Sequence, residues 1–222
     1  MKRRDFSSLL ATVPVLGAAS AAFAQGGPVE GRQYQVLASR VPTGTPGKIE
    51  VIEFFWYGCP HCYAFEPAIE AWSKKLPADV AFRKVHVAFR ANVKIHQRMF
   101  FALEALGKEA QARPAIFNAI QQQGQALDDP KTQAKFLGMM GIDPAKYQEA
   151  YNSFGVIAKC TQAEKLSDAY RIDGVPSVGV AGRFLTSPAM AGAGLRANEA
   201  ELGQQALQVV DFLIQRARAT KA

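Results

Sequence analysis

The sequence predicts an α/β fold into which a block of helices is inserted. Three observations predict it: a buried strand that leads at once into a helix and a second strand, a middle segment of punctuated helical patterns, and a closing hairpin followed by an amphipathic helix. The chain has 222 residues, of which 49% are hydrophobic and 20% charged, as in ordinary globular proteins. Wholesale disorder, a fibrous repeat and a disulfide-dense mini-protein are therefore excluded.

The first segment of the chain, 1–24, is expected to be a secretory signal peptide rather than part of the fold. Basic residues at 2–4 precede an apolar stretch over 9–22, and a small-residue cleavage pattern follows at 22–24. The apolar stretch is shorter than the roughly 20 residues that a membrane span needs. We expect export to a bacterial periplasm, where disulfide chemistry is permitted, and the paired arginines leave a twin-arginine signal open as an alternative route.

The next segment, 25–89, is predicted to form a βαβ unit after a short extended stretch at 33–37. Residues 48–57 form a nearly continuous run of β-branched and aromatic side chains, which is typical of a strand buried on both faces. Residues 63–76 carry apolar side chains at helical spacing, and 80–89 alternate as a second strand. The two strands are therefore expected to lie parallel.

Residues 90–156 are predicted to be an inserted all-helical domain, because Gly and Pro punctuate a series of helical patterns. Asp129-Pro130 and Asp143-Pro144 are typical helix starts, in which an aspartate caps the helix and proline takes its first position. Pro114 is predicted to open a further helix over 115–123.

The last segment, 157–222, is predicted to complete the domain that 25–89 begins. A helix is expected over about 156–171, followed by a β-hairpin over 177–186. Asn198 and Glu201 then form a capping-box pattern, which predicts the start of a final helix with basic residues at its C-terminal end.

A Cys-x-x-Cys motif, Cys59 and Cys62, lies where the buried strand meets the helix. Two intervening residues let the sulfurs meet, and a helix N-terminus offers unpaired N–H groups to a thiolate. Cys59 is expected to be the exposed, attacking nucleophile, and Cys62, one turn inward, the resolving thiol. Pro60 stiffens the loop, and His61 can carry positive charge or donate a hydrogen bond toward the Cys59 sulfur. Because a stabilised thiolate favours the reduced form, the disulfide is expected to be a strong oxidant.

Other uses of the two cysteines fit the sequence less well. A closed zinc site lacks a second Cys-x-x-Cys pair, a c-type haem attachment would need His where Tyr63 stands, and a structural disulfide over so short a loop adds little stability. A periplasmic copper or zinc carrier that uses both thiolates remains the alternative from another class. Nucleic-acid binding is not expected, because the basic residues behind the net charge of +7 are scattered and no recognition motif is present.

Several motifs together resemble the DsbA family, the periplasmic thiol:disulfide oxidases with a thioredoxin-like fold and an inserted helical domain. The resemblance extends over nearly the whole mature chain, and its motifs are Glu-Phe-Phe at 53–55, Cys-Pro-His-Cys-Tyr at 59–63, Phe-Glu at 65–66 and Gly-Val-Pro at 174–176. It implies that Cys59 is the nucleophile, His61 its thiolate-stabilising partner and Cys62 the buried resolving thiol.

The resemblance also assigns residues around the dithiol. Val175 and Pro176 are similar to the family's cis-proline loop, which pairs with an extended substrate. Glu53 is the only acid in an apolar stretch of its strand, so we expect it to be buried and to pair with Lys84 on the neighbouring strand. By resemblance this pair transfers protons at Cys62 and tunes the redox potential. The alternative is a surface ion pair that contributes at most about 1 kcal/mol.

The function implied is donation of the Cys59–Cys62 disulfide to newly exported proteins that carry free thiols. The resemblance implies no cofactor besides this disulfide, and re-oxidation by a quinone-linked membrane oxidase of the DsbB type. We expect a monomer without metal, and a disulfide isomerase or reductase on the same fold stays open as an alternative. A third cysteine, Cys160, is expected to be a buried, inert thiol on a helix, with an intermolecular disulfide as the alternative.

Overall fold

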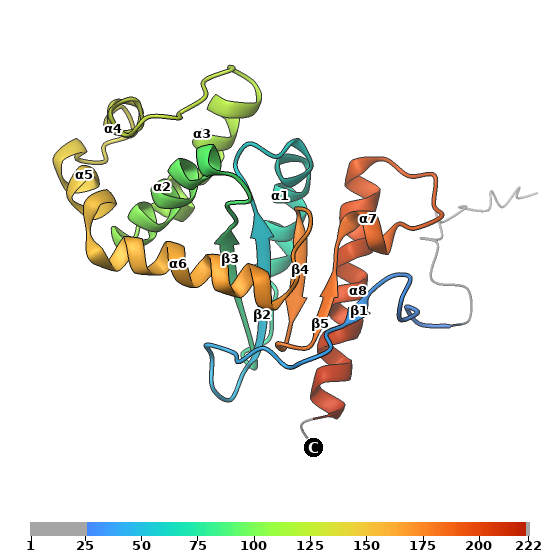
Figure 1. The fold of residues 1–222 in the computed structure, drawn as a ribbon. Coiled ribbons are helices and arrows are strands. Elements are labelled where there is room, and N and C mark those ends of the chain that lie inside the picture. The colour runs from blue at the N-terminus through green and yellow to red at the C-terminus, as the bar shows by residue number, and fades with distance from the viewer. Residues whose placement is uncertain (1–25, 221–222) are drawn as a thin grey trace, which may run out of the picture.

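The computed structural model describes residues 26–220, which form one sheet flanked by helices (Figure 1). The predicted signal peptide lies outside the described residues. Among residues 26–220, no helix combines the length and the apolar character needed to cross a membrane.

The described part of the chain is built on a mixed sheet. Its strands are β1 (Gln35–Val36), β2 (Ile49–Phe55), β3 (Val80–His86), β4 (Ser177–Val180) and β5 (Phe184–Thr186), in the order β1-β5-β4-β2-β3. Strand β2 pairs parallel with β3, as predicted, and antiparallel with β4. Every residue of β2 is buried, as its apolar sequence predicts for a central strand with both faces covered.

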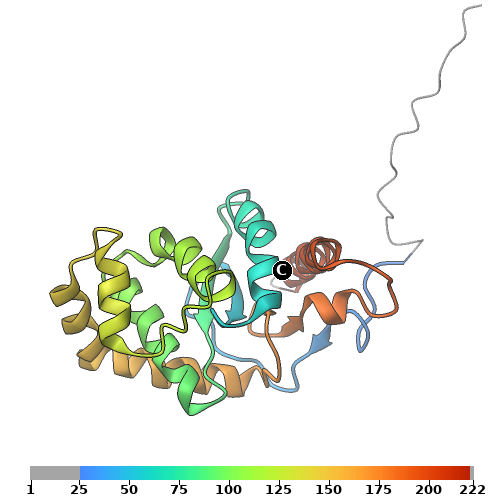
Figure 2. The same ribbon diagram turned by 90° about the horizontal axis from the view of Figure 1, so that it is seen from above.

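Helices cover both faces of the sheet. Helices α1 (Pro60–Ser73) and α8 (Glu199–Ala219) lie side by side on one face, and α6 (Phe154–Ala169) lies on the other (Figure 2). The first face buries a cluster that includes Val51, Phe65 and Val210. The second buries a larger cluster, including Phe54 and Tyr170, that continues into the neighbouring helices.

The helices between β3 and α6 pack beside the β3 edge of the sheet (Figure 1). They are η1 (Ala91–Val93), α2 (Lys94–Ala105), α3 (Glu109–Gln121), α4 (Pro130–Gly138) and α5 (Pro144–Asn152). Helix α6 is capped by Ser153 and begins at Phe154, so the predicted boundary at 156/157 falls inside this helix. The division into a thioredoxin-like domain and an inserted helical domain stays a prediction.

The predicted capping signals are confirmed at three helix starts, and the predicted hairpin is confirmed as well. Asp129 and Asp143 accept hydrogen bonds from backbone N–H groups at the starts of α4 and α5. Asn198 and Glu201 form the predicted capping box of α8. The predicted hairpin corresponds to β4 and β5, and a short helix that was not predicted, α7 (Pro188–Ala191), follows it.

The prediction that Pro114 opens a helix is wrong. Helix α3 begins at Glu109 and contains Pro114 in its interior. Buried contacts on both sides of the proline, at Ala112 and Ile116, hold the two parts in one helix although proline removes one helical hydrogen bond. Tertiary packing thus outweighs the local signal.

The β4–β5 turn depends on a glycine with no room for a side chain. Gly182 has a φ of 64°, and a Cβ there would lie 2.0 Å from the Val41 carbonyl oxygen. The Val41 N–H donates a hydrogen bond of 2.8 Å to the Gly182 carbonyl, so the two backbones are fixed against each other. Gly107 has the same φ of 64° but nothing within 4 Å of such a Cβ.

We predict that Gly182→Ala destabilises the protein more than Gly107→Ala does. Both alanines adopt a left-handed backbone, which costs about 1–2 kcal/mol. Only Gly182→Ala adds a steric clash, expected to cost about 2 kcal/mol more. Urea unfolding of both variants measures the difference, and equal losses would contradict the account of this turn.

Candidate active site

The dithiol lies at the carboxyl end of β2, where the chain turns into α1. Cys59 is the N-cap residue of α1, with an extended backbone, and Pro60 occupies the first helical turn, where its missing N–H needs no partner. Gly58 packs against the indole of Trp56, since a Cβ at Gly58 would lie 2.3 Å from that ring. The turn therefore fixes where the Cys59 sulfur lies.

Hydrogen bonds surround the Cys59 sulfur. The Cys62 backbone N–H donates to it at 3.3 Å, and the Cys59 thiol donates to the Val175 carbonyl oxygen, also at 3.3 Å. Hydrogen bonding from the Cys62 thiol and from the backbone N–H groups of Cys62 and His61 lowers the pKa of Cys59 to about 6, against the opposing effect of burial. The charge of His61 adds a smaller effect in the same direction.

The expectation that Cys59 is the exposed cysteine is wrong as to exposure. Cys59 is only 6% exposed, because the loop that carries Val175 covers its sulfur. Cys62 is completely buried, and its burial, reinforced by the neighbouring Cys59, raises its pKa well above the usual value. Both are free thiols in this structure, so the reduced pair is asymmetric: position 59 favours a thiolate and position 62 a thiol.

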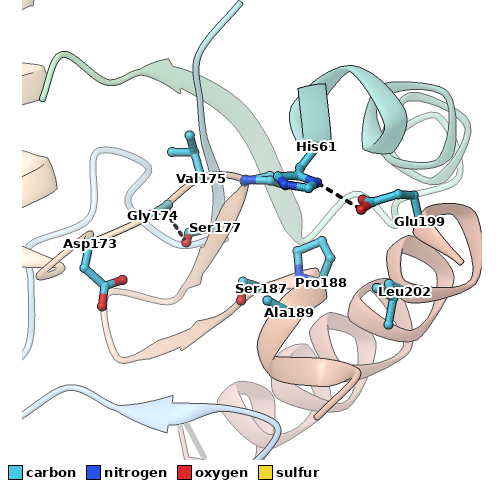
Figure 3. A pocket seen from close by; sticks show the side chains of 11 residues that line it. His61, Asp173, Gly174, Val175, Ser177, Ser187, Pro188, Ala189, Glu199 and Leu202 are labelled. Atoms are coloured by element: carbon cyan, nitrogen blue, oxygen red, sulfur yellow. Dashed lines mark hydrogen bonds and ion pairs between the residues drawn. The ribbon is translucent and has the colours of Figure 1, made fainter. Parts of the chain in front are cut away.

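The predicted substrate loop lies beside the dithiol. Because β4 runs antiparallel to β2, the start of β4 lies next to the carboxyl end of β2. The peptide bond between Val175 and Pro176 is cis. These residues line a cavity of about 270 Å³ that lies between the loop, α7 and the start of α8 (Figure 3).

His61 lines the same cavity as the substrate loop, and its ring reaches Glu199 of the last helix (Figure 3). Its Nδ1 lies 2.9 Å from Oε1 of Glu199, the first residue of α8, and the two side chains are 63% and 49% exposed. The geometry explains why His61 contributes less to the low pKa of Cys59 than the helix N–H groups do. Sequence reasoning missed Glu199, because nothing local links it to a motif so far away in the chain.

Glu53 and Lys84 meet beneath α1, in register on β2 and β3. The Lys84 ammonium donates hydrogen bonds to Glu53 and, at 2.9 Å, to Oε2 of Glu66. Glu53 is completely buried, and its other carboxylate oxygen has no hydrogen-bond partner among the described residues. Burial raises the pKa of Glu53 to about 7, although Lys84 acts in the opposite direction.

Two buried histidines hold the segment that leads into the dithiol, one through its backbone and one through a side chain. His86 accepts a hydrogen bond from the Tyr57 N–H at Nε2, and His96 accepts one from the Trp56 indole N–H at Nδ1. The second nitrogen of each ring faces a carbonyl oxygen at 2.8 Å, which favours a neutral tautomer. Burial lowers the pKa of both rings.

Cys160 lies on α6, away from the dithiol, and is half-buried rather than fully buried. Its partial burial raises its pKa to about 11. The thiol is therefore protonated at neutral pH, which agrees with the expected lack of reactivity.

Comparisons with known proteins agree with this geometry. A sequence model of the DSBA-like thioredoxin domain matches residues 93–194. The thiol:disulfide interchange protein DsbA of Burkholderia cepacia is 48% identical over 175 residues, which are 78% of this chain and 82% of that protein. The crystal structure of DsbA from Pseudomonas aeruginosa superposes with a TM-score of 0.81 at 40% identity, over 87% of this chain and 96% of that one. The chain belongs to the DsbA family.

Membership of the DsbA family confirms the predicted fold, a thioredoxin-like α/β fold, and the predicted enzyme class, a thiol:disulfide oxidoreductase. The relative from Azotobacter vinelandii, 44% identical over 86% of this chain and 85% of its own length, carries the same name. Within residues 26–220, no three His, Cys, Asp or Glu side chains are grouped so that they could hold a metal ion.

This DsbA-family site includes charged residues to which sequence reasoning gave no role. Glu66 comes four residues after Cys62 on α1, and this helical spacing was a signal that could have placed it under the dithiol. Arg113 comes from α3 and pairs with Glu66 across the two packed helices. No local pattern brings Arg113 to this place, because its contacts are long-range.

We predict that Glu53→Gln changes how stability depends on pH. The folded pKa of Glu53 is raised from 4.5 to about 7, so the folded state holds a proton that the unfolded state has lost between these values, and stability falls as pH rises through that window. Glutamine removes this loss, which is on the order of 3 kcal/mol for a fully buried group.

Urea unfolding from pH 4 to about 8 in the reduced and oxidised states tests this expectation. The Glu53→Gln variant should gain stability relative to the wild type as the pH rises. Parallel pH profiles of the two proteins would contradict the buried-acid assignment.

Proposed function

We propose that the protein is a monomeric periplasmic oxidase that donates the Cys59–Cys62 disulfide to newly exported proteins with free thiols. The asymmetry of the two thiols carries the proposal: the pKa of Cys59 is lowered to about 6, whereas that of Cys62 is raised. A dithiol whose reduced form holds a stabilised thiolate gives an oxidising disulfide.

The reaction begins when a thiolate of the exported protein to be oxidised, the client, attacks the Cys59 sulfur of the disulfide. The Cys59–Cys62 bond breaks, a mixed disulfide forms at Cys59, and the electron pair leaves on Cys62. A second client thiolate then attacks the client sulfur of the mixed disulfide and displaces Cys59 as its stabilised thiolate. The client loses two electrons and gains its disulfide, and the enzyme is left reduced.

Glu53 is the proposed proton donor to Cys62 in the first step, and Lys84 is its positioning residue. Two observations support these roles: the pKa of Glu53 is raised to about 7, so it exchanges its proton near neutral pH, and its charge is close enough to raise the pKa of Cys62. In the reverse direction, Glu53 accepts the proton when Cys62 resolves a mixed disulfide.

The cavity beside Val175 and Pro176 is the proposed client site. Its lining combines the substrate loop with apolar side chains, among them Pro188 and Leu202 (Figure 3). Val175, which lines it, also accepts the hydrogen bond from the Cys59 thiol. An extended peptide seated there would bring its own sulfur close to Cys59. A membrane oxidase of the DsbB type is the proposed partner that re-oxidises the dithiol.

The equilibrium between the Cys59–Cys62 pair and glutathione tests the direction of the reaction. The oxidase proposal requires a potential well above that of thioredoxin, which is about −270 mV. A potential near that value would overturn the proposal in favour of a reductase. Tight, stoichiometric metal bound to the reduced protein would instead favour a metal carrier.

We predict that His61→Ala makes the disulfide less oxidising. Loss of the positive charge of His61 raises the pKa of Cys59 and so destabilises the reduced form. The effect on the glutathione equilibrium should be about tenfold or less, since one pKa unit corresponds to a factor of ten. An unchanged equilibrium constant would contradict a role for His61 at the dithiol.

A further prediction assigns the nucleophile. In Cys62→Ser, Cys59 should attack the disulfide of a peptide and keep the peptide bound as a mixed disulfide, because the resolving thiol that would release it is gone. Cys160→Ser, which removes the thiol outside the dithiol, should turn over like the wild type. Mass spectrometry of the adducts identifies the modified sulfur, and an adduct on Cys160 would overturn the assignment.

A further inference from the structure

One arginine of the inserted helices reaches the charged residues beneath Cys62. Arg113 of α3 donates hydrogen bonds from Nη1 to Glu70 and, at 2.9 Å, to Oε1 of Glu66, both on α1. Its Nε and Nη2 bind Glu109, one turn earlier on its own helix, at 2.9 and 2.6 Å. The Arg113 side chain is only 9% exposed, so its charge is weakly screened by solvent.

Glu66 is the carboxylate that both cations share. Its Oε1 accepts from Arg113, and its Oε2 accepts at 2.9 Å from Lys84, which also holds Glu53. Hydrogen bonds thus run without a break from the inserted helices to Glu53 on β2. Glu66 follows Cys62 by one helical turn on α1, so the network extends along the helix that carries the dithiol.

The cluster holds fewer cations than carboxylates. Arg113 and Lys84 lie among the carboxylates of Glu53, Glu66, Glu70 and Glu109. Without Arg113, Lys84 would be the cation left in this cluster to neutralise Glu66 and Glu70 as well as Glu53. Its hold on Glu53 would weaken as a result.

We propose that Arg113 is a positioning residue for the redox reaction: by binding Glu66, it leaves Lys84 free to hold Glu53 in the state that exchanges a proton with Cys62 at neutral pH. The inference rests on the proton-transfer role of Glu53 proposed above. It assigns to the inserted helices a part in the chemistry of the dithiol.

The direction of the effect follows from the charges that face Glu53. Lys84 of β3, Glu66 of α1 and Arg113 of α3 act directly on Glu53, and the charge of Glu53 in turn acts on Cys62 of α1. Glu70 binds both cations, and Glu109 binds Arg113. The Tyr57 hydroxyl donates to Glu109 at 2.8 Å, and β4 places the apolar Val178 opposite Glu53. The charge of Arg113 lowers the pKa of Glu53, and the charge of Glu66 raises it. Removing Arg113 therefore raises the pKa of Glu53, and removing the negative charge of Glu109 leaves Arg113 less neutralised and acts in the opposite direction.

The experiment follows the step in which Cys62 resolves a mixed disulfide. Protein carrying glutathione on Cys59 is prepared by rapid mixing, and release of glutathione is measured in single turnovers from pH 5 to about 9. In Arg113→Gln, the midpoint of the pH profile should move upward by about 0.5 pH unit or more, and in Glu109→Gln it should move downward. Arg113→Lys, which keeps the charge, should lie closer to the wild type.

Arg98→Gln is the matched control. Arg98 is another arginine of the inserted helices that hydrogen-bonds within the protein, to the Tyr151 carbonyl and at 3.2 Å to Asn152, and these partners lie outside the cluster. This variant also loses a hydrogen-bonded guanidinium, as Arg113→Gln does. Because the lost contacts lie outside the cluster, the midpoint of its pH profile should stay at the wild-type value. A shift equal to that of Arg113→Gln would overturn the inference.

Glu53→Gln distinguishes a failure of the Arg113 inference from a failure of the proposed proton-transfer role of Glu53. If Glu53→Gln removes the pH dependence but Arg113→Gln and Glu109→Gln leave the midpoint in place, the inference is overturned and the role of Glu53 stands. If Glu53→Gln leaves the profile unchanged, both are overturned. If Arg113→Gln does not fold, the double variant Arg113→Gln/Glu109→Gln, which removes both charges, replaces it. Its midpoint should lie above that of Glu109→Gln alone. Equal midpoints of these two variants would overturn the inference.

Discussion

The chemistry of this protein depends on the hydrogen bond that the Cys62 backbone N–H donates to the Cys59 sulfur at the start of α1. A helix N-terminus offers N–H groups that no residue within the helix can satisfy, and a sulfur anion at the N-cap accepts one of them. The buried strand β2 and the packing of Gly58 on Trp56 hold the sulfur in that position. The fold thus stabilises a thiolate with hydrogen bonds from the Cys62 thiol and from the backbone N–H groups of the first helical turn, and the charge of His61 adds a smaller contribution.

A second constraint is the burial of an acid under the dithiol. A carboxylate without solvent is costly unless cations and hydrogen bonds compensate it, and Lys84 supplies only part of this compensation because one oxygen of Glu53 has no partner among the described residues. Burial therefore raises the pKa of Glu53 to about 7, so at neutral pH the side chain is divided between its protonated and ionised forms. The same cost explains why Glu66 recruits a further cation, Arg113, from the inserted helices.

Local signals predicted most of the fold but only part of the site. The central strand, the Asp-Pro helix starts and the capping box of α8 were predictable because residues close in sequence determine them. The continuation of α3 through Pro114 was not, because distant packing outweighs the proline. The predicted pairing of β2 and β3, together with the family resemblance, also placed Glu53 beside Lys84. The contacts of Glu199 and Arg113 join segments far apart in the chain, which no local pattern encodes.

The most direct test of the account is a titration of the Cys59 thiolate. Ultraviolet absorbance of the reduced Cys160→Ser variant, followed as the pH is raised, reports ionisation of the dithiol alone. The account predicts one thiol ionising with a pKa of about 6 and a second that stays protonated well above the ordinary cysteine range. A Cys59 that ionises at its ordinary value of 9.0 would contradict the account.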